Sequence, residues 1–177
     1  VQLEKGSAVF VFDENDRKIS FWHDIPLQMQ GYAKNQFNMV MEISSVTKAK
    51  MEISRDMEFN PIVQDEETNP NDVASKRPRD YAILPIFNYG ALPQTWEDPN
   101  RTTEAKGEIY GGDQDPIDIV EISGRPLVRF DVYKVNIIGA LKCIDSGEVD
   151  WKLLAIEANS PLSKTVKTIV DFRTMYP

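Results

Sequence analysis

Short apolar runs separated by turn residues restrict the fold of this chain more than any other feature of its sequence. Candidate strands cover 7–12, 18–22, 37–43 and 49–53, and later 117–122, 127–135, 137–144 and 149–158. Each is rich in β-branched or aromatic residues, and turn clusters such as 13–16 and 145–148 separate them. Many short strands at regular spacing favour a closed barrel over an open sheet, so we predict a mainly β (α+β) fold.

Other segments lack a clear strand pattern. We expect polar loops at 64–80 and 98–115, where prolines, asparagines or glycines interrupt the chain, and an irregular packed stretch at 88–96. Only the tail has helical spacing, with an i, i+3, i+4, i+7 pattern that starts at Val166. Ser163 or Thr165 is the expected N-cap of that helix. No repeat or linker divides residues 1–177, which predicts a single domain.

The charge balance excludes several classes of function. The 177 residues include 28 acidic and 20 basic ones, for a net charge of −8. This excess disfavours nucleic acid as the main partner, since a phosphate backbone calls for a basic stripe, and it is compatible with binding cations. No apolar run approaches the roughly 18 residues that span a bilayer, and no signal segment opens the chain, so we expect a cytoplasmic protein and no membrane partner. One cysteine and one histidine nearly exclude a Cys/His zinc site.

Three carboxylates cluster within six residues, at Asp113, Asp115 and Asp118. Pro116 interrupts the alternation of a strand, so these side chains can converge instead of pointing to opposite faces. Crowded carboxylates repel each other, and a hard divalent cation relieves the repulsion. A solvated acidic loop is an equally good interpretation of this spacing alone. An EF-hand is excluded, because its twelfth position would be Gly124 instead of Glu, and the remaining metal interpretation is a magnesium site that shares substrate phosphates.

Two further charged elements accompany this run. Asp145 and Asp150 flank the turn expected at 145–148, and Asp150 shares a strand face with Lys152. The other element lies on two predicted strands and consists of Glu42, Lys50 and Glu52. Taken singly, each element is more typical of solvated surface charges than of a site.

Five motifs in order along the chain resemble those of the soluble family I inorganic pyrophosphatases, in their eukaryotic form. They are FWHDIPL (21–27), FNMVMEI (37–43), NYGALPQTWEDPN (88–100), GDQDPID (112–118) and GEVDWK (147–152). The resemblance implies an OB-like five-stranded β-barrel with additional hairpins and few flanking helices. It also implies Mg²⁺-dependent hydrolysis of pyrophosphate to two orthophosphates, and a homodimer.

The resemblance assigns roles to the carboxylates by position. Asp113, Asp118 and Asp150 resemble the ligands of the tightest-bound metal, and Asp118 also resembles a bridge to a second metal. Asp115 resembles the residue that accepts a proton from the water between those two metals. Asp145 and Glu52 resemble ligands of the metals that arrive with substrate. Glu42 resembles an outer-shell carboxylate.

The phosphate-binding side chains implied by the resemblance are Lys50, Tyr89 and Lys152, and Tyr89 and Lys152 also belong to the expected catalytic set with Asp115. The family also places an arginine on the loop before the NYG motif. Either Arg77 or Arg79 can supply it, and we favour Arg79.

The sequence departs from the family pattern in two places. Pro85 stands where the family usually has a tyrosine, and Tyr81 is a candidate substitute. The family also continues past Pro177 into a terminal helix with a Tyr-Lys pair that touches phosphate, so this domain is expected to lack that helix. A catalytically impaired fragment or scaffold is therefore the alternative to an active enzyme.

Counting charges gives the expected number of metal ions. Seven carboxylates and three cations in the predicted site leave about −4, which two Mg²⁺ ions neutralise, and pyrophosphate adds about −4 more. We therefore expect about three or four Mg²⁺ ions per site during turnover. Two other functions compete with this one. The chain could be a non-catalytic module that binds single-stranded nucleic acid on an OB-like barrel, or a hydrolase of another phosphoanhydride.

Overall fold

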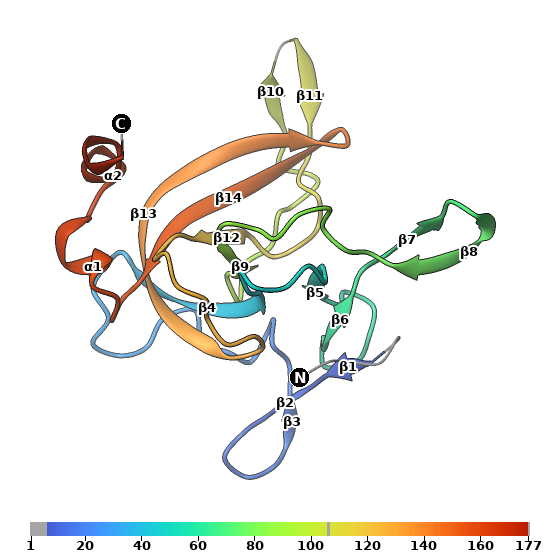
Figure 1. The fold of residues 1–177 in the computed structure, drawn as a ribbon, viewed down its shortest axis with the longest axis horizontal. Helices are drawn as coiled ribbons and strands as arrows, with labels where there is room; N and C mark the ends of the chain where they lie inside the picture. Colours follow the sequence, from blue (N-terminus) through green and yellow to red (C-terminus); the bar gives the residue numbers. More distant parts are fainter. Residues whose placement is uncertain (1–6, 106, 177) are drawn as a thin grey trace.

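A closed barrel of five strands forms the centre of the protein in the computed structural model, which describes residues 7–105 and 107–176 (Figure 1). Its strands are β4 (Gln36–Ile43), β9 (Asn88–Ala91), β12 (Asp118–Glu121), β13 (Val132–Asp145) and β14 (Glu148–Glu157). Around the barrel the order is β4-β9-β12-β14-β13, and only the β12–β14 pair among these barrel neighbours is parallel. This Greek-key order confirms the predicted OB-like barrel.

Small sheets surround the barrel, as the prediction of additional hairpins required. β1 (Ala8–Val9), β6 (Ile62–Gln64) and β5 (Met51–Ile53) form a three-stranded sheet, and β2 (Val11–Phe12) pairs with β3 (Lys18–Ile19). Two further hairpins are β7 (Glu66–Asn69) with β8 (Asp72–Pro78), and β10 (Thr103–Ala105) with β11 (Glu108–Tyr110). Figure 1 shows both projecting from the body, with β10–β11 beside the turn that joins β13 to β14.

These two projecting hairpins correct the prediction of loops at 64–80 and 98–115. No residue of their strands is buried, so polar residues occupy both faces and no apolar alternation marks them. The stretch predicted to be irregular at 88–96 begins with barrel strand β9. Gly90 weakens the strand pattern of this segment, but the structure requires a glycine here. A side chain at this position would overlap with the backbone carbonyl of Val40 on β4.

A single long strand, β13, replaces the two strands predicted at 127–135 and 137–144. The polar Asn136 suggests a break, but a β-bulge between Ile137 and Gly139 lets the strand bend around the barrel without ending. The turn predicted at 145–148 is present. Ser146 and Gly147 both have positive φ values, 51° and 88°, as a tight two-residue hairpin turn requires.

The two described helices lie in the tail, where helical spacing was expected. They are α1 (Leu162–Thr165) and α2 (Ile169–Met175). The predicted N-cap is wrong, because Ser163 and Thr165 lie within α1, and α2 begins after Thr168. Thr168 accepts a hydrogen bond from the backbone N–H of Asp171, and Asp171 accepts one from Thr168 in return, so this reciprocal cap determines where α2 starts. No described helix is long and apolar enough to cross a bilayer.

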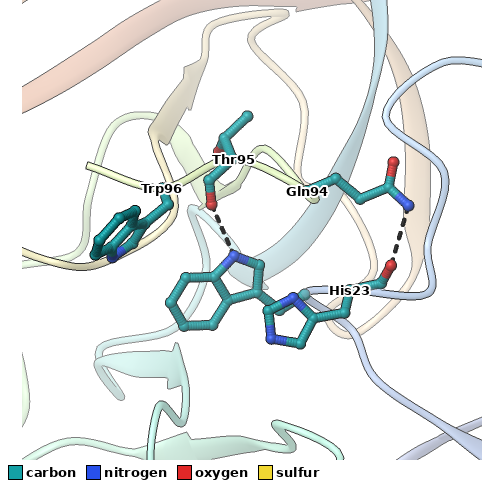
Figure 2. Close-up of a pocket in the computed structure, with 5 residues that line it drawn as sticks. His23, Gln94, Thr95 and Trp96 are labelled. Carbon is teal, nitrogen blue, oxygen red and sulfur yellow. Dashed lines mark hydrogen bonds between the residues drawn. The ribbon is translucent and has the colours of Figure 1, made fainter. Parts of the chain in front are cut away.

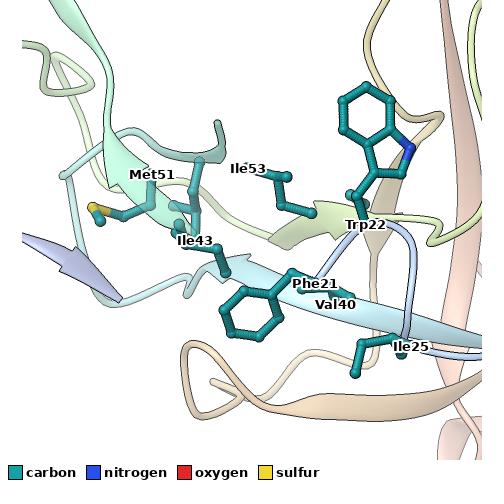
Figure 3. Close-up of a cluster of buried hydrophobic side chains, with 9 residues drawn as sticks. Phe21, Trp22, Ile25, Val40, Ile43, Met51 and Ile53 are labelled. Carbon is teal, nitrogen blue, oxygen red and sulfur yellow. The ribbon is translucent and has the colours of Figure 1, made fainter. Parts of the chain in front are cut away.

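The core explains why β4 reads as a nearly continuous apolar run. Met39 and Met41 pack inside the barrel, whereas Val40 and Ile43 belong to a second buried cluster that joins the barrel wall to the three-stranded sheet (Figure 3). Both faces of β4 are therefore buried, and the strand can carry a side chain such as Glu42 only in a nearly solvent-free environment.

The close approach of β9 to β4 generates a stability prediction. Gly90→Ala should lower the free energy of unfolding by about 3 kcal/mol, because its methyl group would push the two strands apart. Gly139→Ala is the matched control, since its nearest neighbour is the Ile169 side chain at an ordinary 3.5 Å, and it should change stability by less than about 1 kcal/mol. Urea unfolding measures both, and equal effects would contradict this account of β9.

Candidate active site

A cavity of about 660 Å³ opens where β4, β5, β9, β12 and β14 meet. Eleven of the twelve predicted site residues line it: Glu42, Lys50, Glu52, Arg79, Tyr89, Asp113, Asp115, Asp118, Asp145, Asp150 and Lys152. The exception is Arg77, whose side chain on β8 donates to Glu67 at 2.8 Å. The structure therefore brings together residues that are more than 100 positions apart in the sequence.

Parallel pairing of β12 with β14 places Asp118 directly opposite Lys152. The Lys152 ammonium contacts one carboxylate oxygen each of Asp118 and Asp150, at 2.7 Å and 2.6 Å, and the Tyr89 hydroxyl at 2.8 Å. The Tyr89 hydroxyl also donates to Asp118. Burial opposes the charged form of Lys152, but the two carboxylates raise its pKa, while burial and Asp118 raise the pKa of Tyr89. This cluster thus holds a fixed positive charge and a neutral phenol.

The acidic loop before β12 is ordered by its own hydrogen bonds. Asp113 accepts the backbone N–H of Asp115 at 2.9 Å, and Gln114 between them has a φ of 72°. Burial raises the pKa of Asp115 to about 6, although Arg55, whose Nε lies 3.5 Å from Asp115 Oδ1, acts in the opposite direction. Burial also raises the pKa of Asp118 to about 6, against the attraction of Lys152. Burial therefore disfavours the ionised forms of both carboxylates.

A second group of charges lies on the wall formed by β5 and the segment after β8. Lys50 Nζ contacts Glu52 Oε2 and Asp65 Oδ2, both at 2.8 Å, and Arg79 Nη1 contacts the same oxygen of Asp65 at 3.0 Å. Backbone bonds from Lys50 to Arg79 and from Arg79 to Asp65 keep the three residues side by side. Asp65 thus holds two cations at the edge of the cavity.

Glu42 lies deepest among the predicted residues. It is buried on β4 and accepts the backbone N–H of Ile53 at 2.8 Å. Burial and the nearby Asp118 raise its pKa well above the usual value for a glutamate. Burial therefore favours the protonated form of this side chain over its charged form.

Sequence reasoning missed three charged residues near the acidic loop and the cationic wall: Arg55, Asp65 and Glu97. Arg55 also donates to the backbone carbonyl of Asp113 at 3.0 Å. Burial raises the pKa of Glu97 to about 8, and Asp113 and Asp150 add to this effect. Glu97 belongs to the NYGALPQTWEDPN motif, so a signal was present for it, whereas Arg55 and Asp65 have no recognisable motif.

The donor set of the cavity fits a hard divalent cation. Oxygen atoms of Glu97, Asp113 and Asp150 all lie within 4.8 Å of one another. Asp150 Oδ1 is buried and has no hydrogen-bond partner among the described residues. Carboxylate oxygens without sulfur or imidazole neighbours select ions such as Mg²⁺ or Mn²⁺, and such an ion would satisfy the unpaired oxygen.

Another cavity, of about 690 Å³, has a different character (Figure 2). Trp22 donates from its indole nitrogen to the Thr95 carbonyl at 2.7 Å, and Gln94 donates to the His23 carbonyl at 3.0 Å. His23 is exposed and stacks on Trp22, with ring centroids 5.1 Å apart. No carboxylate lines this cavity, so it offers no cluster of metal ligands.

Comparison with known proteins gives a consistent picture. A family model described as inorganic pyrophosphatase matches residues 39–176. An inorganic pyrophosphatase of Drosophila melanogaster is 45% identical over 183 residues, which cover 99% of this chain and 52% of that protein. A chloroplastic soluble inorganic pyrophosphatase of Arabidopsis thaliana is 39% identical, covering 96% of this chain and 53% of its own length.

Solved structures agree with these sequence matches. A type I inorganic pyrophosphatase from Toxoplasma gondii superposes with a TM-score of 0.85 at 37% identity, covering 99% of this chain and 75% of that one. An N-terminally truncated vacuolar soluble pyrophosphatase of Trypanosoma cruzi, in complex with PPi, has a TM-score of 0.76 at 36% identity, covering 91% and 61%. This chain spans about half the length of the curated relatives it matches. The chain belongs to the inorganic pyrophosphatase family.

Proposed function

We propose that this chain hydrolyses inorganic pyrophosphate to two orthophosphates in the presence of Mg²⁺. The observation that carries the proposal is one cavity in which the carboxylates of β12, β14 and the acidic loop, all buried or half-buried, face a wall of cations. An anhydride with four negative charges and its divalent counter-ions fits such a divided surface. The family membership and the pyrophosphate complex of the Trypanosoma cruzi relative support this choice of substrate.

The carboxylates have two tasks in this proposal. Asp113, Asp118 and Asp150 hold the tightest Mg²⁺ ion, with Glu42 as a buried carboxylate behind them. Asp145, on the exposed end of β13, and Glu52 receive further ions that enter with the substrate. Bound Mg²⁺, at about three or four ions per site, supplies charge neutralisation for pyrophosphate and lowers the pKa of the attacking water.

The cations and phenols hold the substrate. Lys152, Lys50 and Arg79 bind phosphate oxygens, which would take over the positions of the carboxylate partners that these cations contact now. Tyr89 donates to a phosphate oxygen from a position fixed by Lys152 and Asp118. Tyr81 is half-buried in the wall of the same cavity and is placed to replace the tyrosine that Pro85 removes.

Asp115 acts as the base. The oxygen of a water forms a bond to one phosphorus, the bond from that phosphorus to the bridging oxygen breaks, and the proton of the water moves to the Asp115 carboxylate. The second orthophosphate leaves with the electron pair of the broken bond, and Lys50, Arg79 and Lys152 stabilise its charge. Arg55 also lines the cavity and orients Asp115, since it contacts both this carboxylate and the backbone carbonyl of Asp113.

The homodimer, which rests on the family resemblance, and the cytoplasmic location, which rests on the sequence pattern, both stay predictions. The relatives include mitochondrial and chloroplastic forms, so membership of the family does not decide the compartment. An impaired enzyme that serves as a scaffold is the alternative function, and it predicts metal binding without phosphate release.

The first test is phosphate release from pyrophosphate. We expect release with Mg²⁺, none in excess chelator, and inhibition by Ca²⁺, because the larger ion prefers longer and more numerous oxygen contacts than this crowded site offers. A colorimetric phosphate assay measures all three conditions. Release that persists in chelator would rule out the metal-dependent mechanism, and metal binding without any release would favour the scaffold.

The second test concerns the base. Asp115→Asn should lower kcat by at least about 100-fold, because the amide cannot accept the proton. Its unfolding free energy should change little, since this half-exposed carboxylate has one weak ion pair. Asp16→Asn, at an exposed turn with a φ of 57°, is the matched control and should keep full activity. An unchanged rate in Asp115→Asn would remove this residue from the base role.

The third test uses the raised pKa values. Asp115 and Asp118 bind protons more tightly in the folded, metal-free chain, with pKa values of about 6 against an ordinary 3.8. By linkage, the stability of the metal-free chain should fall as pH rises from about 4 to 6. Mg²⁺ needs ionised ligands, so the increase in Tm that it causes should grow over the same interval. Thermal unfolding at pH 5 and pH 7 measures this, and an equal Mg²⁺ effect at both would contradict it.

A further inference from the structure

Glu97 is a buried carboxylate that the proposed roles leave unused. It follows β9 by a short segment and is only 7% exposed. One of its oxygens lies within 4.8 Å of an oxygen of Asp113 and an oxygen of Asp150. The three residues come from three separate parts of the chain: the segment after β9, the loop before β12, and β14. Only the closed barrel brings them together.

Hydrogen bonds from both the main chain and the side chain fix Glu97 in this position. Its carboxylate Oε1 accepts the backbone N–H of Trp151 at 2.9 Å, which ties it to β14. Its own N–H donates to the carbonyl of Asp115 at 2.9 Å, and its carbonyl accepts from Gln114 at 3.0 Å. Glu97 therefore spans the gap between the acidic loop and the strand that carries Asp150.

The backbone of the acidic loop also packs directly on Glu97. A side chain at Gly112 would overlap with the Glu97 carbonyl, so the close contact depends on this glycine. The loop cannot move away from Glu97 without losing the hydrogen bonds described above. These backbone contacts consequently fix the distance between Glu97 and Asp113.

A second observation points to a ligand at this place. Asp150 is 7% exposed, and its Oδ2 is bound by Lys152, whereas its Oδ1 is buried without a hydrogen-bond partner among the described residues. A buried carboxylate oxygen is costly unless a donor or a cation satisfies it. Beside Asp113 and Glu97, which are themselves carboxylates, a cation is the partner that relieves both the unpaired oxygen and the repulsion.

We propose that Glu97 is an additional carboxylate of the metal centre and faces the divalent ion that Asp113, Asp118 and Asp150 hold. The inference rests on the proposed metal-dependent function. Ligand oxygens around Mg²⁺ lie about 2.1 Å from the ion, hence at most about 4.2 Å apart, so the observed set needs only a small closure. Glu97 adds a negative charge beside the ion and, through its bonds to Trp151 and the acidic loop, keeps Asp113 and Asp150 at their spacing.

Glu97→Gln tests this role, because glutamine keeps the volume and the acceptor for the Trp151 N–H but loses the charge. Mn²⁺ titrated into the metal-free protein, with binding followed by calorimetry and by electron paramagnetic resonance, should show about 10- to 100-fold weaker affinity at the tightest site. Glu104→Gln removes the same charge from an exposed position on β10 and should bind Mn²⁺ like the unmodified chain. Unchanged Mn²⁺ affinity in folded Glu97→Gln would overturn the proposal.

A second variant covers the case in which Glu97→Gln does not fold. Glu97→Asp keeps the charge but withdraws the oxygen from the ion, so weaker Mn²⁺ binding supports the role and unchanged affinity overturns it. The outcome is separate from that of the proposed function. If the chain hydrolyses pyrophosphate but Mn²⁺ binding does not depend on Glu97, only this inference is rejected. If Mn²⁺ binding depends on Glu97 but no hydrolysis occurs, only the proposed hydrolytic function is rejected.

Discussion

The parallel pairing of β12 with β14 is the constraint on which the rest of the site depends. It closes the barrel and, in the same step, sets Asp118 opposite Lys152. A parallel neighbour brings residues 34 positions apart into one row, which a hairpin cannot do. Tyr89 joins from β9 on the other side of β12, so one strand orders the cation, the phenol and the carboxylate.

Charge crowding is the second physical theme of this structure. The negative charges of the acidic loop, β12 and β14 are only partly offset by Lys152, and burial raises the pKa values of Asp115 and Asp118 to about 6. On the opposite wall Asp65 is shared by two cations. Both walls therefore have partners that a metal ion and a phosphate could replace, which is what a site for a charged substrate and its counter-ions requires.

Much of the fold was predictable where local spacing carries information. The apolar run of β4, the turn at 145–148 and the helical tail were all visible, because burial or turn chemistry determines each one locally. The hairpins β7–β8 and β10–β11 were not visible, since none of their strand residues is buried and they have no apolar face. Strand β9 was hidden because its Gly90 is selected by close backbone contact, a requirement that belongs to its neighbour β4.

The sequence by itself determined which carboxylates and lysines belong together, because short motifs such as 112–118 and 147–152 carry them in recognisable order. Only the tertiary structure showed that Arg79 lines the cavity and Arg77 does not, and only it brought in Arg55, Asp65 and Glu97. The physical reason is the range of the contacts. Alternation along a strand places neighbours two residues apart, whereas Glu97 meets Trp151 across 54 positions, a distance that only the register of the closed barrel specifies.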